Sequence, residues 1–186
     1  MQKNSYAKLD VLVADPSPHM SGLVASMLRH LKVHAVSEAS SSHQALAALQ
    51  LKKFGVIFVD DELTPIDGVA FTRVVRQTAE GLNRDTPVIM MSTHPSAARI
   101  AAARDAGITE FLRKPFAGNH IATRLDAILA APRPFIASPA YVGPDRRRRN
   151  AAPPVEERRQ KPIGSDQAPA GAEVDPVDDS AISSQR

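Results

Sequence analysis

Residues 56–68 read VIFVDDELTPIDG, and this stretch decides the fold. Its first four residues are large, apolar and mostly β-branched, which is typical of a short strand buried on both faces of a sheet. Asp60 and Asp61 follow directly, and Pro65 and Gly68 indicate a loop before a helical pattern begins. A buried strand that is followed by a helix is the repeating unit of a parallel sheet, so this stretch predicts an α/β protein.

The same alternation extends over residues 9–130 and predicts five strand–helix units. Besides 55–59, the runs typical of strands lie at about residues 9–14, 33–37, 88–91 and 109–113. Four polar residues stand at or just after the ends of these runs: Asp15, Asp60, Ser92 and Lys114. Because the carboxyl ends of parallel strands meet at one edge of the sheet, where ligands bind, we expect these four side chains to converge.

Local signals predict where several helices begin and end. Ser17 followed by Pro18 indicates an N-cap with proline at the first helical position. The serine cluster at 40–42 predicts the start of the second helix, and Gly107 fits the left-handed residue that ends the fourth. A last helix with one apolar face is expected over about residues 118–130.

Composition excludes several classes of protein. The chain has 186 residues and no cysteine, which excludes disulfide bonds and cysteine-bound zinc. No apolar run approaches the roughly 20 residues that a membrane helix needs. The first residues lack the apolar core of a secretion signal, so we expect a cytoplasmic protein.

The chain changes character near residue 132, where proline, arginine and small residues replace large apolar ones. We therefore predict one domain over residues 1–131 and a disordered tail over 132–186, with no recognisable output or DNA-binding domain. The run Arg146–Arg149 could contact an acidic protein, a membrane surface or nucleic acid, or it could be a solvated linker. No aromatic platform or helix-turn-helix supports the nucleic-acid alternative.

Four motifs together make the chain resemble the receiver domain of two-component response regulators, of the stand-alone chemotaxis type. They are VLVAD at 11–15, DDELTPIDG at 60–68, MMST at 90–93 and FLRKPF at 111–116, in the family's order and spacing. The resemblance covers about residues 8–131 and implies a flavodoxin-like, doubly wound sheet of five parallel strands in the order 2-1-3-4-5, with five helices. The segment YVGPDRRRR at 141–149 also resembles one found after some alphaproteobacterial receiver domains.

The resemblance assigns roles to particular residues. It implies that Asp60 is the phospho-acceptor, since a carboxylate can attack a phosphoryl group and form an acyl phosphate. Lys114 would pair with the acceptor and then with the phosphoryl group, and its bond to Pro115 would be a cis peptide. Ser92 would be the switch hydroxyl, although a serine here could also cap the next helix. Phe111 would be the aromatic switch residue, although it could equally be part of the core.

The expected metal site departs from the family pattern at one position. The resemblance implies a Mg²⁺ ion held by Asp15, Asp60 and the backbone carbonyl of Glu62, because Mg²⁺ prefers oxygen ligands. Pro16 stands where the family has a second acid that binds the metal directly, so we expect weakened Mg²⁺ binding. The Glu62 carboxylate could compensate in part, whereas Asp61 should point away by strand alternation.

These residues predict a single-domain response regulator. It would accept a phosphoryl group on Asp60 from a histidine kinase or phosphotransfer protein and signal to a downstream effector protein through protein–protein contacts. Beyond its own phosphorylation and dephosphorylation we do not expect it to be an enzyme. Pro16 motivates an alternative, a pseudo-receiver that binds proteins without being phosphorylated.

Overall fold

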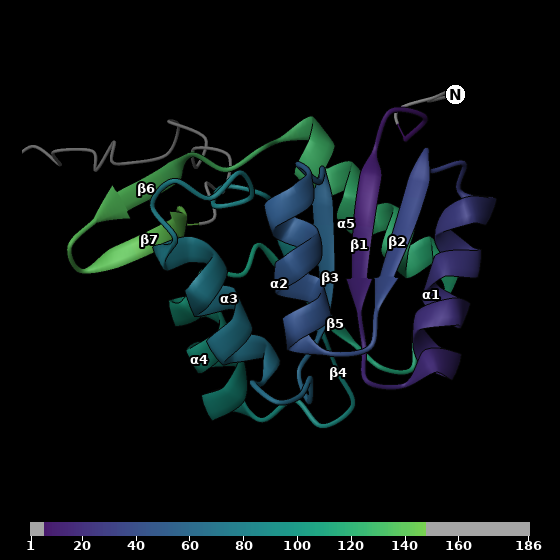
Figure 1. Cartoon of the computed structure of the whole chain (residues 1–186), viewed down its shortest axis with the longest axis horizontal. Coiled ribbons are helices and arrows are strands. Elements are labelled where there is room, and N and C mark those ends of the chain that lie inside the picture. Colours follow the sequence, from purple (N-terminus) through teal and green to yellow (C-terminus); the bar gives the residue numbers. More distant parts are fainter. Residues whose placement is uncertain (1–5, 148–186) are drawn as a thin grey trace, which may run out of the picture. The chain divides into compact units, whose positions relative to one another are not determined.

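The computed structural model describes residues 6–147, which belong to one compact unit. In this part of the chain five parallel strands form a sheet in the order β2-β1-β3-β4-β5, as the resemblance implied (Figure 1). The strands are β1 (Asp10–Ala14), β2 (Ala35–Ala39), β3 (Val56–Asp60), β4 (Val88–Ser92) and β5 (Glu110–Arg113). The helices that alternate with them are α1 (Pro18–His30), α2 (Ser42–Leu51), α3 (Gly68–Gln77), α4 (Ala97–Ala106) and α5 (Gly118–Ala130).

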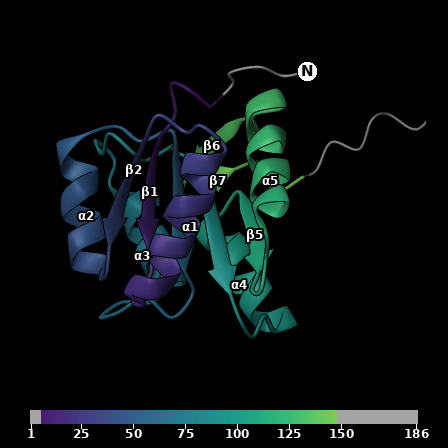
Figure 2. The same ribbon diagram turned by 90° about the vertical axis from the view of Figure 1, so that its right-hand side faces the viewer.

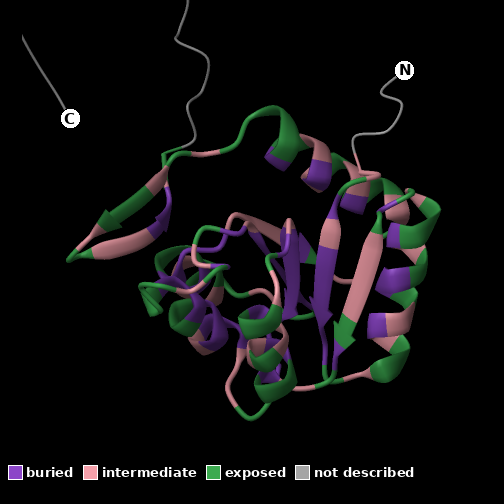
Figure 3. Cartoon of the chain, turned by 45° about the horizontal axis from the view of Figure 1, so that its top comes forward, coloured by how far each residue is buried: buried purple, intermediate pink, exposed green. Residues whose placement is uncertain are grey.

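Helices cover both faces of the sheet, and each face has its own hydrophobic core. Helices α2, α3 and α4 pack on one face, while α1 and α5 pack on the other (Figures 1 and 2). Successive strand residues alternate between these cores: Ile57 belongs to the first and Phe58 to the second. Strands β3 and β4 are buried throughout, and the central strands stand out as buried in Figure 3. This two-sided burial explains why their sequences are continuous apolar runs.

The predicted helix ends are confirmed. Ser17 caps α1 by accepting a hydrogen bond from the Met20 amide at 3.4 Å, and Pro18 is the first helical residue. Ser41 caps α2 in the same way, and Gly107 ends α4 with a φ of 95°. Strand β2 differs from the prediction because it begins at residue 35 rather than 33. As an edge strand, its extent is set by pairing with β1 more than by its own hydrophobicity.

The prediction of disorder from residue 132 is wrong for the segment that the structure describes. Phe135–Ser138 (β6) and Tyr141–Pro144 (β7) form an antiparallel hairpin (Figure 1). Each strand has only 4 residues, and the Pro139-Ala140 connection lacks the Asn-Gly type of dipeptide that marks a hairpin in sequence. Residues 148–186 of the predicted tail, including the end of the arginine run, lie outside the described residues.

The hairpin packs against the ends of α3 and α4. The side chain of Arg76 is almost completely buried, and its guanidinium lies 5.7 Å from the centre of the Phe135 ring. The same guanidinium donates a hydrogen bond to the Gly107 carbonyl at 3.0 Å, and burial lowers the pKa of Arg76 to about 10. A Cβ atom on Gly107 would lie 2.8 Å from the carbonyl oxygen of Val142. The absence of a side chain at Gly107 therefore permits β7 to approach α4 closely.

Two charged contacts add to this packing. Arg133 pairs with Glu110 at 2.8 Å, where the chain leaves α5. Arg146, the first arginine of the basic run, lies over the Tyr141 ring at 3.9 Å and pairs with Asp105 of α4 at 3.2 Å. One member of the predicted binding run is thus engaged within the domain itself.

Candidate functional site

The four polar residues predicted to converge lie at one edge of the sheet, and hydrogen bonds join three of their side chains, Asp15, Asp60 and Lys114, whereas the Ser92 hydroxyl bonds Asp61. Asp60 and Ser92 are the last residues of β3 and β4, while Asp15 and Lys114 come directly after β1 and β5. Parallel pairing aligns these ends, since Asp60 pairs with Met91. The juxtaposition follows from strand order and register, because residues far apart in sequence close neighbouring parallel strands.

Lys114 joins two of the carboxylates. Its ammonium lies 2.7 Å from Oδ2 of Asp15 and 2.5 Å from Oδ2 of Asp60. The three side chains are only 11%, 2% and 8% exposed, respectively. Burial raises the pKa of Asp60, although Lys114 opposes this effect. Burial alone would lower the pKa of Lys114, but its hydrogen bonds to both carboxylates raise it, so the lysine stays charged at neutral pH.

The second oxygen of each carboxylate accepts a backbone hydrogen bond. Oδ1 of Asp15 accepts from the Ser17 amide at 2.8 Å, and Oδ1 of Asp60 accepts from the Glu62 amide at 3.0 Å. The loop after β3 can fold back in this way partly because Gly68 has no side chain, since a Cβ there would collide with the Asp60 carbonyl oxygen. The Asp60 carboxylate is therefore held in one orientation by a lysine and an amide from different segments.

Ser92 makes a contact that the sequence reasoning did not anticipate. Its hydroxyl donates to Oδ2 of Asp61 at 3.3 Å, and Asp61 is buried. The Asp61 carboxylate bonds Ser92 and Arg99 rather than Lys114, and its Oδ1 atom accepts a hydrogen bond from Arg99 at 2.6 Å. The alternative in which Ser92 caps the next helix is wrong, because Ser96 caps α4 by accepting from the Arg99 amide at 3.1 Å. No local pattern could have identified Arg99, because its partner lies 38 positions away in the chain.

The remaining predicted residues have mixed outcomes. The Lys114–Pro115 peptide is cis, as predicted, and a second cis peptide joins Thr64 and Pro65. Phe111 is partly buried and packs against the core on the α2–α4 face. Its role as a switch residue stays a prediction, and packing in the core is what the structure describes.

The donor set for a metal ion is small. Within residues 6–147 no group of three or more histidine, aspartate or glutamate side chains is placed to hold a metal. Pro16 contributes no side-chain oxygen, and Glu62 is exposed. Asp15 and Asp60 remain as two adjacent carboxylates, and Mg²⁺ sites that also involve phosphate commonly use only one or two protein carboxylates. The residues present therefore fit a Mg²⁺ ion that is held by few protein oxygens.

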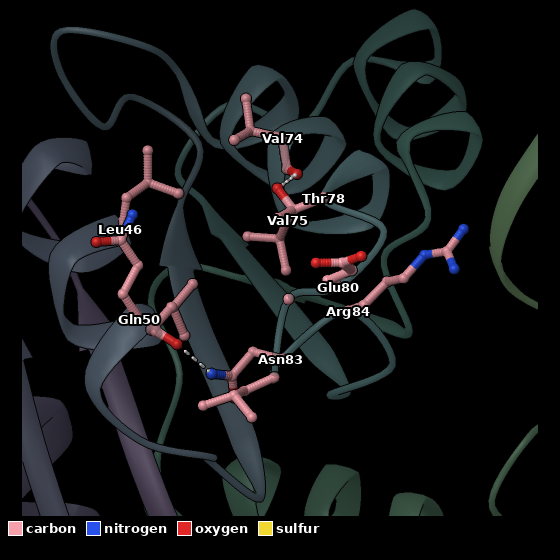
Figure 4. Close-up of a pocket in the computed structure, with 11 residues that line it drawn as sticks. Leu46, Gln50, Val74, Val75, Thr78, Glu80, Asn83 and Arg84 are labelled. Carbon is pink, nitrogen blue, oxygen red and sulfur yellow. Dashed lines mark hydrogen bonds between the residues drawn. The ribbon is translucent and has the colours of Figure 1, made fainter.

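A separate cavity of about 360 Å³ lies between α2, α3 and the loop that follows α3 (Figure 4). Leu46, Val75 and Arg84 are among the residues that line it. Nearby, the Asn83 carboxamide accepts a hydrogen bond from the amide of Phe54, just before β3, at 2.8 Å. The cavity is thus at the amino ends of the strands, on the opposite edge of the sheet from Asp60, and it has no part in the carboxylate site.

Sequence comparison identifies the family. The model of the response regulator receiver domain matches residues 11–126. The transcriptional regulatory protein ZraR of Salmonella typhimurium is 28% identical over 126 residues, which make up 68% of this chain and 27% of ZraR. The nitrogen assimilation regulatory protein NtrX of Azorhizobium caulinodans is 28% identical over 114 residues, which make up 60% of this chain and 24% of NtrX. The chain thus aligns with about a quarter of the length of these curated relatives.

Structural comparison agrees. The chemotaxis protein CheY4 of Vibrio cholerae superimposes with a TM-score of 0.61 at 27% identity, covering 66% of this chain and 99% of CheY4. The receiver domain of the sensor histidine kinase PA1611 of Pseudomonas aeruginosa gives a TM-score of 0.60 at 23% identity, covering 67% and 100% of the two chains. That structure holds a magnesium ion coordinated in its active-site cleft.

This chain therefore belongs to the response regulator receiver domain family. Members of the family are signalling modules of two-component systems, and they interact with histidine kinases and effectors. Mg²⁺ and phosphoaspartate are typical of the family. Among the described residues, no helix is both long enough and apolar enough to cross a membrane.

Proposed function

We propose that this protein accepts a phosphoryl group on Asp60 from a histidine kinase or phosphotransfer protein and signals through protein–protein contacts. The observation that carries the proposal is the bridge from Lys114 to both Asp15 and Asp60 at the carboxyl edge of the sheet. A lysine buried between two carboxylates contributes little to stability, because the cost of desolvating three charges offsets much of their attraction. Such a cluster therefore indicates a functional role for the lysine charge. This exchange with a kinase would take place in the cytoplasm.

The chemistry follows from the groups at the site. A carboxylate oxygen of Asp60 attacks the phosphorus of a phosphorylated histidine on the donor. A phosphorus–oxygen bond forms, the phosphorus–nitrogen bond breaks, and the imidazole leaves with its electron pair and takes a proton from solvent. Lys114 stays within reach of the new phosphoryl oxygens, and its positive charge balances the negative charge that the acyl phosphate carries on them.

Mg²⁺ would be held by the carboxylates of Asp15 and Asp60 and by the backbone carbonyl of Glu62. When bound, the ion supplies positive charge for the phosphoryl oxygens. Because Pro16 removes one metal ligand, Lys114 has to balance a larger share of the negative charge on the phosphoryl oxygens than it would beside a complete acid pair. We expect phosphorylation to depend on Mg²⁺ but to need more of it than a site with both acids.

The alternative is a pseudo-receiver that binds partners without phosphorylation. Pro16 favours it, since the lost ligand weakens the metal site. Against it stands the complete set of Asp60, Ser92 and Lys114, which a simple adaptor does not need.

A two-dimensional NMR titration of the full chain with Mg²⁺ and beryllofluoride, a phosphoryl mimic, tests the proposal, with Asp60→Asn as the matched control. The proposal predicts saturable shifts at Asp60, Ser92 and Lys114 in the parent and none in the variant. Parallel exposure to acetyl phosphate and intact-mass measurement should show one added phosphoryl group on the parent only. A folded parent that responds to neither reagent would establish the pseudo-receiver instead.

A further inference from the structure

Asp61 directly follows Asp60, and its contacts bear on signalling if Asp60 accepts a phosphoryl group as in the proposed function. Asp61 is buried, and its carboxylate bonds Ser92 and Arg99 rather than Lys114. Its Oδ2 atom accepts the Ser92 hydroxyl at 3.3 Å, and its Oδ1 atom accepts Nε of Arg99 at 2.6 Å. A buried carboxylate is costly unless it is paired and hydrogen-bonded, so this pairing is a specific feature of the fold.

Arg99 connects Asp61 to two further elements. Its Nη2 atom donates to the Asp61 carbonyl at 3.2 Å and pairs with Oδ2 of Asp67 at 3.1 Å. Asp67 in turn caps α3, because its Oδ1 atom accepts the Ala70 amide at 2.7 Å. Arg99 lies in the first turn of α4, three residues after its cap Ser96. One guanidinium therefore joins the end of β3, the start of α3 and the start of α4.

The Ser92 hydroxyl has a single proton, so it can donate to one acceptor at a time. In this structure that acceptor is Asp61. A phosphoryl group on Asp60 would offer strong acceptor oxygens at the same edge of the sheet, and Ser92 would have to leave Asp61 to reach them. At 3.3 Å the existing contact is longer than the roughly 2.5–3.0 Å usual for a hydroxyl donor, which suits a contact that must break readily.

We propose that Asp61 is a positioning residue that holds Ser92 in its unphosphorylated orientation, and that Arg99 couples this contact to the start of α4. Asp61 and Arg99 together form a latch. When Ser92 turns toward the phosphoryl group, Asp61 loses the hydrogen bond from the Ser92 hydroxyl. The Asp61 carboxylate then has Arg99 as its remaining side-chain donor, so the contact between Asp61 and Arg99 changes. The first turn of α4 is the element positioned to respond, because Arg99 belongs to that turn and its guanidinium bonds Asp61.

A double-mutant cycle on beryllofluoride affinity tests the latch. In the presence of Mg²⁺, Asp61→Ala should tighten beryllofluoride binding by about threefold to tenfold, because the competing acceptor is gone. Part of that gain would come simply from removing a negative charge near Asp60. Repeating the substitution in a Ser92→Ala background removes the hydroxyl and leaves only the charge effect, so the gain should shrink by at least about threefold.

A second readout reports on α4. Arg99→Gln should speed amide hydrogen exchange in the first turn of α4, whereas Arg104→Gln, an exposed arginine on the same helix, should not. Asp61→Leu, which is close to aspartate in size and has no hydrogen-bond acceptor, serves if Asp61→Ala does not fold. Equal effects of Asp61→Ala with and without the Ser92 hydroxyl would overturn the latch while leaving the proposed function intact. A folded parent that binds no beryllofluoride would overturn the proposed function, and the latch with it.

Discussion

Replacing Gly107 by alanine should destabilise the protein by about 2–4 kcal/mol, through two separate effects. Gly107 has a φ of 95°, in the left-handed region, where a Cβ costs about 1–2 kcal/mol. The new Cβ would also lie 2.8 Å from the Val142 carbonyl oxygen and 3.1 Å from Cγ of Arg76. Neither neighbour yields easily, because one is backbone in β7 and the other belongs to a buried arginine, so overpacking adds about 1–2 kcal/mol.

Urea unfolding of the full chain measures this directly. For a urea dependence of about 2 kcal/mol per molar, the midpoint should fall by about 1–2 M. Gly22→Ala in the interior of α1 is the matched control, since a Cβ there meets nothing within 4 Å. It should raise stability by about 0.5–1 kcal/mol, because alanine favours the helix over glycine. A loss at Gly107 of no more than about 1 kcal/mol would refute the close approach of β7 to α4.

Three further predictions concern buried polar groups. Lys114→Met should cost about 2–4 kcal/mol at neutral pH, because two buried carboxylates lose their cation. The deficit should shrink as pH falls, because burial raises the pKa of Asp60 and protonation removes its charge, as urea midpoints at neutral and acidic pH would show. Burial and then the hydrogen bond to Asp126 raise the pKa of Tyr6 to about 12, so stability should fall as pH rises from about 10 to 12. Near-ultraviolet absorbance of a Tyr141→Phe variant measures this ionisation, and a transition near pH 10 would contradict the environment described for Tyr6. Asn83→Ala should cost about 2–4 kcal/mol in thermal unfolding, because its side chain satisfies one buried amide and two carbonyl groups, and a loss below about 1 kcal/mol would show that water replaces it.

Much of the sheet could be predicted because its signals are local. A strand buried on both faces must be apolar throughout, so β3 and β4 are visible as continuous runs. Caps such as Ser17 and Gly107 act within one helical turn, and their residue types are restricted by backbone geometry. The edge strand β2 was placed less well, since it is only partly buried and takes its limits from pairing with β1.

The candidate site was predictable in its residues but not in its contacts. Asp60, Ser92 and Lys114 could be identified because the ends of parallel strands share an edge. The two acceptors of Lys114 could not be predicted from spacing, because Asp15 and Asp60 are 99 and 54 positions away from it. Arg99 had no signal at all, since an arginine on a helix at the surface of a protein is usually solvated.

The sequence by itself determined the α/β class, the strand and helix order, and the residues gathered at the carboxyl edge of the sheet. These depend on hydrophobic periodicity and on capping, which operate over a few residues. Only the tertiary structure decided that Asp61 holds Ser92, that Arg99 joins three elements, and that β6 and β7 pack on α3 and α4. Such contacts depend on side-chain direction and on distances between segments far apart in the chain, and the free energy that stabilises a short hairpin comes from the surface on which it packs.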